Sequence, residues 1–340
     1  MLGSVIGIEI GNNTIKLIEV IKKGTSLKVE RFSLLETPKN CILDGTMHNI
    51  EPIYQTIAKE ISQKKYKAKK AIILIQGNAI IIRNIVMAKQ SEKVIRQLIA
   101  IRPEEYLPVD TAQYQIDFKI VREFEEKGED KQEVVLVAAP NSIVLPMVNL
   151  IESLKWVPIQ ISIPSQALEK VFGQQERMVD AIDADILVID IGGKSTTVTI
   201  IAQGHAVLTR IIEFGVDVIH EAIDSSFISP EEQEMSKDAK KEYDEYLIEL
   251  IKPQIEYNIL SELERVLQFY YSRFENRPIS KVYLIGGGAN VEGIKTYIQD
   301  ALNIDTKVFN TFSNVIEGPG LEFEEYRRFF VNILGAIHGI

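Results

Sequence analysis

One alternation of apolar and polar positions occurs twice along the chain. Residues 5–10 read VIGIEI, which is apolar apart from one acid; a polar GNNT follows, and IKLIEV then resumes the apolar pattern. From residue 187 the chain reads LVIDIG, GKST and TVTII in the same order. Two apolar runs separated by a short polar stretch with Gly are typical of a β-hairpin. We therefore expect one hairpin in each half of the chain.

The two expected hairpins align residue by residue. Pairing Glu9 with Asp190 also pairs Ile8 with Ile189, and the glycines that follow the acids coincide. A strand–acid–turn–strand unit in each half predicts two similar α/β lobes, because two copies are too few for a solenoid. The expected fold class is therefore α/β with two lobes.

The segment between the hairpins has a rhythm of its own. Patterns within 80–163 follow the order β-α-β-β-α-β, with Pro103 ending or kinking the first helix. This order predicts a small α+β subdomain inserted into the first lobe. The expected division is a first lobe of 1–79, 164–183 and 326–340, the inserted subdomain of 80–163, a second lobe of 184–220 and 276–325, and a helical subdomain of 221–275.

Composition narrows the classes of function. The formal net charge of −10 argues against a broad nucleic-acid surface. The single cysteine, Cys41, excludes an internal disulfide and fits a reducing compartment, and the four histidines lack zinc-ligand spacing. There is neither a signal-peptide pattern nor an apolar run of about 18 residues. We therefore expect a cytoplasmic protein without direct membrane insertion.

Two acids carry the first candidate chemistry. Glu9 and Asp190 both lie in apolar strand patterns just before a turn, and a buried carboxylate is costly unless it is paired or bound to a metal. One such acid alone would more often cap its own loop. At equivalent places in two facing lobes the two acids would meet, and a Mg²⁺ ion between them would relieve their repulsion. Glu9 and Asp190 are the candidate metal residues.

The two turns supply candidate phosphate-binding groups. Small residues let the backbone approach a ligand, and successive N–H groups can cradle phosphate oxygens. Lys16 or Lys194 could add a positive charge. The alternative is that both are ordinary hairpin turns. The candidates are Gly11, Asn12, Asn13, Thr14 and Lys16 in the first hairpin, and Gly192, Gly193, Lys194, Ser195 and Thr196 in the second.

A third glycine turn follows the strand pattern KVYLI. Gly286, Gly287 and Gly288 stand between this strand and a helix pattern, which is a usual ligand position in α/β folds. The turn is not a Rossmann GxGxxG, and the chain has no GxxxxGK[ST] P-loop.

Taken in order, these motifs resemble the actin and heat-shock-chaperone ATPase superfamily, and within it the PilM family of type IV pilus assembly. GIEIGNNTIKLIEV is similar to the family's first hairpin, LVIDIGGKSTTVTII to its second, and VYLIGGGANVEGI to its adenosine motif. The resemblance implies duplicated, ribonuclease H-like lobes in an actin-like fold that holds ATP or ADP with Mg²⁺. It also implies that Glu234 and Lys237, in SPEEQEMSK, approach the adenosine, and that Gly215 remains from a glycine pair.

The same resemblance implies a partner. In the family, a groove between the first lobe and the inserted subdomain takes the cytoplasmic N-terminal peptide of the inner-membrane protein PilN. A PilN-like peptide is therefore the expected partner, with pilus assembly ATPases as further ones, and the expected location is the inner face of the cell membrane. Glu9 departs from the family's Asp, which puts hydrolysis in doubt and indicates at most a slow ATPase.

Two other functions remain open. An FtsA-like cytoskeletal tether needs an amphipathic helix beyond a linker, whereas this sequence stops at Ile340 directly after its last expected core helix. A small-molecule kinase of the same superfold needs a general base and a polar acceptor pocket, and no sugar-binding cluster is visible in the sequence.

Overall fold

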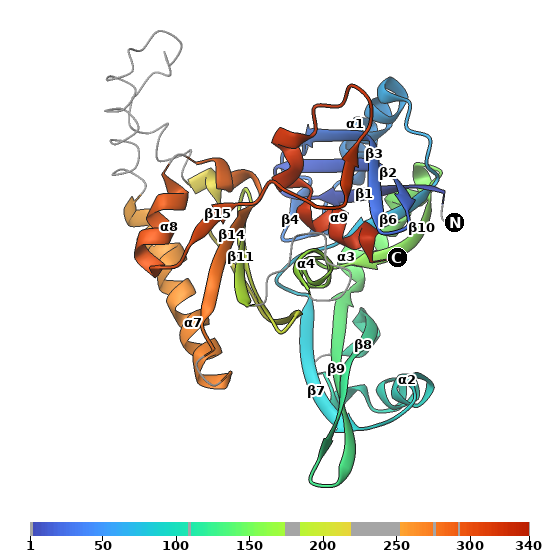
Figure 1. Ribbon diagram of the computed structural model, residues 1–340. Helices are drawn as coiled ribbons and strands as arrows, with labels where there is room; N and C mark the ends of the chain where they lie inside the picture. The colour runs from blue at the N-terminus through green and yellow to red at the C-terminus, as the bar shows by residue number, and fades with distance from the viewer. Residues whose placement is uncertain are drawn as a thin grey trace.

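Two β-sheets form the centres of two lobes in the computed structural model, which describes residues 3–107, 110–173, 184–218, 252–274, 277–291 and 293–339 (Figure 1). The first sheet has the strand order β10-β6-β1-β2-β3-β16. Its centre is buried on both faces, which explains the nearly continuous apolar runs of β1 and β6. The bounds are β1 (Ser4–Ile10), β2 (Thr14–Lys23), β3 (Ser26–Glu36), β6 (Lys70–Leu74), β10 (Val157–Ser162) and β16 (Val315–Glu317).

Helices cover both faces of this first sheet. On one face, α1 (Ile50–Lys64) and α3 (Asn141–Ser153) pack their apolar sides on strand residues such as Ile6 and Ile8. On the other face lie α4 (Pro164–Phe172) and α9 (Val331–His338), and all eight residues of α9 are buried. The first lobe is therefore a three-layer α/β unit.

The second sheet repeats the local topology of the first. Its order is β13-β12-β11-β14-β15, with β11 antiparallel to β12 and parallel to β14, just as β1 is antiparallel to β2 and parallel to β6. The two predicted hairpins are thus confirmed. The bounds are β11 (Asp185–Ile191), β12 (Thr196–Ala202), β13 (His205–Ile212), β14 (Ile279–Ile285) and β15 (Thr306–Val308), with helices η4 (Glu256–Leu260), α7 (Ser261–Arg273) and α8 (Ile294–Leu302).

A three-stranded sheet projects from the first lobe (Figure 1). It consists of β7 (Ile81–Ala88), β8 (Tyr114–Glu126) and β9 (Glu129–Pro140) in the order β7-β9-β8. Helix α2 (Glu92–Ile101) covers one face, where Ile95 and Ile99 contact Val134 and Leu136. The opposite face carries exposed apolar side chains such as Val86.

The predicted domain division differs from the observed strand pairing in two places. The predicted β-α-β-β-α-β order of 80–163 is observed, but its last two elements belong to the first lobe, because β10 pairs with β6 in the first-lobe sheet and α3 packs on that sheet. Strand β16, predicted within the second lobe, pairs with β3 of the first. Most of the predicted helical subdomain 221–275 lies outside the described residues.

The two lobes share one apolar core. Val171 and Phe172 of α4 and the buried face of α9 belong to the same cluster as Ile186 and Val188 of β11. The backbone N–H of Ala206 also donates to Oε1 of Glu169 on α4, at 2.9 Å. This common packing fixes the two hairpins relative to one another.

Short elements complete the described chain: β4 (Ile42–Leu43), β5 (Thr46–Met47) and the 3₁₀ turns η1 (Pro103–Glu105), η2 (Thr111–Gln113), η5 (Gly287–Asn290) and η6 (Glu324–Phe329). Of the two effects expected of Pro103, ending or kinking the helix, the structure shows the first, because α2 stops at Ile101 and η1 begins at the proline. In the described ranges, no helix combines the length and the apolar character that crossing a membrane requires.

The close packing of α4 against α9 requires a glycine at position 335. A methyl group there would overlap the carbonyl oxygen of Ala167, which is backbone and cannot rotate away. We expect Gly335→Ala to lower the free energy of unfolding by about 1–3 kcal/mol, the usual cost of overpacking a core, as measured by denaturant titration. Gly339→Ala, at the exposed end of the same helix, is the control with little change. Equal effects of the two variants would contradict this packing.

Candidate functional site

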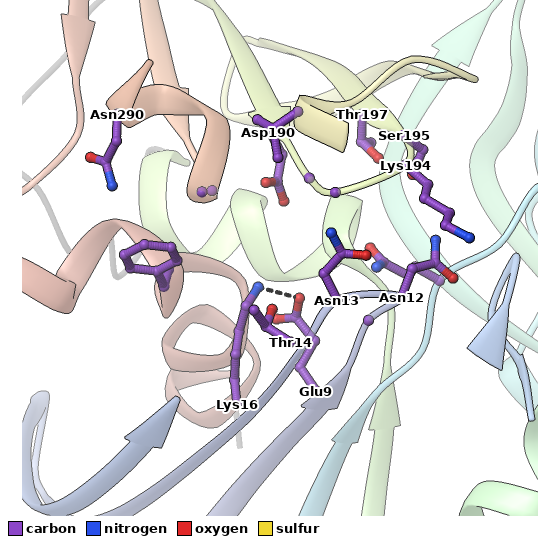
Figure 2. Close-up of a pocket in the computed structure, with 18 of the residues that line it drawn as sticks. Glu9, Asn12, Asn13, Thr14, Lys16, Asp190, Lys194, Ser195, Thr197 and Asn290 are labelled. Atoms are coloured by element: carbon purple, nitrogen blue, oxygen red, sulfur yellow. Dashed lines mark hydrogen bonds and ion pairs between the residues drawn. The ribbon is translucent and has the colours of Figure 1, made fainter. Parts of the chain in front are cut away.

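A cavity of about 420 Å³ lies where the two hairpins and the glycine turn after β14 face one another (Figure 2). Thirteen of the residues predicted from the sequence line it: Glu9, Gly11, Asn12, Asn13, Thr14, Lys16, Asp190, Gly192, Gly193, Lys194, Ser195, Gly286 and Gly287. The structure therefore brings three segments that are distant in sequence to one place, as the duplicated pattern predicts.

The two hairpin turns close in the same way. In the first, the N–H of Gly11 donates to the carbonyl of Thr14 at 2.9 Å, and in the second the N–H of Gly192 donates to Ser195 at the same distance. The equivalence of the two acid–turn units thus extends to their backbone hydrogen bonds.

The two glycines of the second turn are closely packed. At Gly193 a side chain would overlap the amide of Asn13, which itself donates to Asp217. Gly215 has a different role: a side chain there would overlap the backbone of Gly192 and Gly193, and it does not line the cavity. The N–H of Val216 donates to the Gly192 carbonyl at 3.0 Å, so this segment supports the turn from behind.

The glycine turn after β14 bears directly on Asp190. Gly286 has a φ of 80°, a left-handed conformation that favours glycine, and a side chain there would overlap Oδ1 of Asp190. Gly288 instead packs on the side chain of Ile191 and does not line the cavity. Only the first two glycines of the triplet therefore face the site.

Glu9 and Lys16 form an ion pair inside the cavity. They are opposite one another in the β1–β2 register, and the Lys16 Nζ lies 2.5 Å from Oε1 of Glu9. Glu9 is 2% exposed and Lys16 8%. Figure 2 shows both side chains extending from the first lobe toward Asp190, which points down from the second.

Burial and charge act together on this pair. Burial raises the pKa of the Glu9 carboxyl, and Asp190 adds to the rise while Lys16 opposes it. Burial by itself would lower the pKa of the Lys16 ammonium, but Glu9 and Asp190 together raise it above its usual range. Lys16 consequently carries its positive charge in the site.

Asp190 has a neutral partner. The Nδ2 of Asn332, on α9 of the first lobe, donates to Oδ2 of Asp190 at 2.7 Å. An amide orients a carboxylate without cancelling its charge, whereas the Glu9 charge is balanced by Lys16. The two equivalent acids therefore have different electrostatic environments.

Two buried oxygens of lining residues accept no hydrogen bond from the described residues. They are Oε2 of Glu9 and Oδ1 of Asn12. Buried acceptors left without donors suit a bound cation or its water molecules. In the described ranges, no group of three or more His, Cys, Asp or Glu side chains is arranged so that it could hold a metal ion by itself. A metal here would therefore rely on two acids, water and a ligand.

The remaining predicted residues differ in exposure. Lys194 is exposed and, in Figure 2, projects away from the Glu9–Lys16 pair; with Ser195 it also borders an adjoining cavity of about 260 Å³. Thr196 is fully buried, donates its hydroxyl to the Phe214 carbonyl at 2.7 Å and lines neither cavity. Glu234 and Lys237 lie outside the described residues.

Comparisons with known proteins agree with this geometry. A family model described as "Type IV pilus assembly protein PilM" matches residues 7–336. The chain belongs to the PilM family. It is also 25% identical to the cell division protein FtsA of Bacillus subtilis (strain 168), over 89% of this chain and 78% of that protein.

Solved structures confirm the two-lobed actin-like fold expected for a PilM-family chain. A chain of a PilM–PilN type IV pilus biogenesis complex superposes with a TM-score of 0.81 and 22% identity, over 98% of both chains. The ethanolamine utilization protein EutJ from Carboxydothermus hydrogenoformans gives a TM-score of 0.54 at 13% identity, over 98% of this chain and 89% of that one.

Sequence reasoning missed several residues of the site. Gln76 follows β6 and lines both cavities, and Thr197 does so from β12. Asn290 and Phe329 border the cavity beside Gly286 and Gly287. The signal for Gln76 was available, because it directly follows an apolar strand adjacent to β1. For Asn332, the signal was a single amide in an otherwise apolar helix pattern.

The buried ion pair generates a stability prediction. Lys16→Met leaves the Glu9 charge buried without a partner, and breaking such a pair costs about 3–5 kcal/mol. We expect a loss of this size in denaturant unfolding without any ligand. Adding Glu9→Gln to Lys16→Met removes the stranded charge and should restore most of the stability. A double variant as unstable as the single one would show that the charge is not the cause.

Proposed function

We propose that the protein binds ATP or ADP with Mg²⁺ in the inter-lobe cavity and acts as a structural adaptor of type IV pilus assembly. The observation that carries the proposal is the convergence of two equivalent acid–turn units and a glycine turn on one cavity. The unpaired buried oxygens of Glu9 and Asn12 support a cation with its water. Membership of the PilM family supports the assignment to the pilus.

Each part of the cavity has a distinct task in this proposal. Backbone N–H groups of the two turns would hold phosphate oxygens, with Lys16 supplying positive charge beside them. The Gly286–Gly287 turn would lie against the nucleoside, with Asn290 and Phe329 at its border. Asp190, and beyond it Glu9, would hold the water shell of Mg²⁺, which would offset phosphate charge. Glu234 and Lys237 stay predicted contacts to the adenosine.

The first test is nucleotide binding by thermal melting and titration. ATP with Mg²⁺ should raise the melting temperature, because a ligand that binds only the folded state stabilises it by mass action. Asp190→Ala should weaken Mg-ATP binding by about tenfold or more, as for loss of a metal-site partner. Lys194→Ala, on the exposed part of the second turn, is the matched comparison and should lose less. Equal losses would contradict the role of Asp190, and no shift with folded wild type would contradict the site.

A groove of about 510 Å³ lies between the inserted sheet and the rest of the protein. The uncovered face of the sheet, with Ile82 and Val86, there faces α4 and the β12–β13 turn. Val86 is 56% exposed there, and the rim carries Lys119 paired with Glu169 and Arg122 paired with Glu133. An extended apolar segment with polar ends fits such a groove. We assign it to the cytoplasmic N-terminal peptide of a PilN-like inner-membrane protein.

In this reading the protein would be cytoplasmic and held at the inner face of the membrane by its partner, with pilus assembly ATPases as further partners. A PilM–PilN complex is the subject of one similar solved structure. That likeness supports a PilN-like partner here. FtsA-like filament formation and small-molecule phosphorylation are the alternatives.

The groove is tested by peptide titration. Val86→Lys puts a charge on its apolar floor and should reduce affinity for the synthetic peptide by about tenfold or more, since desolvating an unpaired charge is costly. Ile101→Lys, on the exposed side of α2 in the same subdomain, is the control and should bind as wild type. Phosphate release in the same samples should stay well below the roughly 1–10³ s⁻¹ of typical enzymes. Ordinary enzymatic turnover, or transfer to a small metabolite, would favour the kinase instead.

A further inference from the structure

Asn332 stands out among the residues of α9. The helix reads VNILGAIH, every residue is buried, and Asn332 is 2% exposed. Its Oδ1 accepts no hydrogen bond from the described residues. An unsatisfied buried polar atom is destabilising, and a residue that breaks the local apolar pattern at such a cost is typical of a functional position.

The hydrogen bond of the Asn332 side chain to Asp190 crosses between the lobes. Its Nδ2 donates to Oδ2 of Asp190 at 2.7 Å. On the other oxygen, Oδ1, the carboxylate lies against Gly286, which has no side chain to displace it. The Asp190 carboxylate is therefore held on one side by an amide and on the other by backbone.

The choice of an amide matters for charge. Lys16 lies 2.5 Å from Glu9 and balances that carboxylate, so Glu9 has less charge to offer a cation. A neutral amide orients Asp190 and leaves its full negative charge available. Of the two equivalent acids, Asp190 is the one that forms no direct ion pair with a cation of the described residues, although the Lys16 charge also acts on it at longer range.

We infer that Asn332 is the positioning residue for Asp190, and that through it the C-terminal helix of the first lobe sets the divalent-cation dependence of nucleotide binding. This inference rests on the proposed nucleotide function. Asn332 acts through Asp190, and its effect is confined to binding that requires the metal.

The experiment measures ATP affinity with Mg²⁺ and with EDTA, for wild type and Asn332→Leu. Leucine has a similar size but cannot donate to Asp190. The gain in affinity that Mg²⁺ gives should fall by about 10–100-fold, as for loss of an outer-shell partner of a metal site. In EDTA, the ATP affinity of the variant should stay within about twofold of wild type, because Asp190 then holds no metal for Asn332 to position. The melting temperature without ligand should stay equal or rise, because an unsatisfied amide oxygen is removed.

A double-mutant cycle tests whether Asn332 acts through Asp190. In an Asp190→Ala background, Asn332→Leu should have no further effect on the Mg²⁺ gain, because residues that act as a unit are non-additive. Ile337→Val, which trims the same helix without contacting Asp190, is the packing control and should keep the full gain. If Asn332→Leu does not fold, Asn332→Ser, which is small, polar and too short to reach Asp190, replaces it.

The outcomes separate the two proposals. A wild type whose ATP affinity gains nothing from Mg²⁺ would overturn the metal-nucleotide function and this inference with it. A wild type with the gain, and a variant that keeps it, would overturn the inference alone. Parallel losses with Mg²⁺ and EDTA, or additive effects with Asp190→Ala, would show a structural role for Asn332 and equally overturn it.

Discussion

Two carboxylates that face one cavity from opposite lobes are the constraint on which the site depends. Glu9 and Asp190 occupy equivalent positions in the two hairpins, and like charges close together in a low-dielectric site repel strongly. The protein compensates them differently, with the Lys16 ammonium at Glu9 and the Asn332 amide at Asp190. The duplicated backbone therefore carries an asymmetric site, with one acid paired with a lysine and the other with a neutral amide.

The Asn332–Asp190 contact requires the two lobes to keep a fixed relative position. The shared core, in which α4 and α9 of the first lobe pack with β11 of the second, supplies the fixed frame. Asn332 lies on α9 itself, so the helix that joins the lobes also orients the acid. Gly286 makes the same connection from the other side, since its N–H donates to the Arg328 carbonyl of η6 at 3.1 Å.

Sequence pattern predicted most of the fold and the centre of the site. The two hairpins, their acids and most of the turn residues could be predicted because they repeat, and because glycine and a buried acid leave local signatures. The ends of the inserted subdomain could not be predicted. Strand β10 has the same apolar alternation whether it pairs inside the insertion or with β6, and only long-range register decides between them. The Glu9–Lys16 ion pair was missed for a different reason. The hairpin register puts the two residues opposite one another, but one was predicted to bind the metal and the other the phosphate.

The same geometry places the cavity between the lobes and the inserted sheet close together along the chain. Gln76 lines the cavity, and β7 begins only at Ile81. Between them, Gly77 has a φ of 155° and lies against the backbone carbonyl of Asp44, while Asn78 donates to Glu213 of the second lobe at 3.2 Å. The connection is therefore short, closely packed and anchored to both lobes. A shift of one lobe relative to the other would therefore act directly on the connection between the cavity and the inserted sheet.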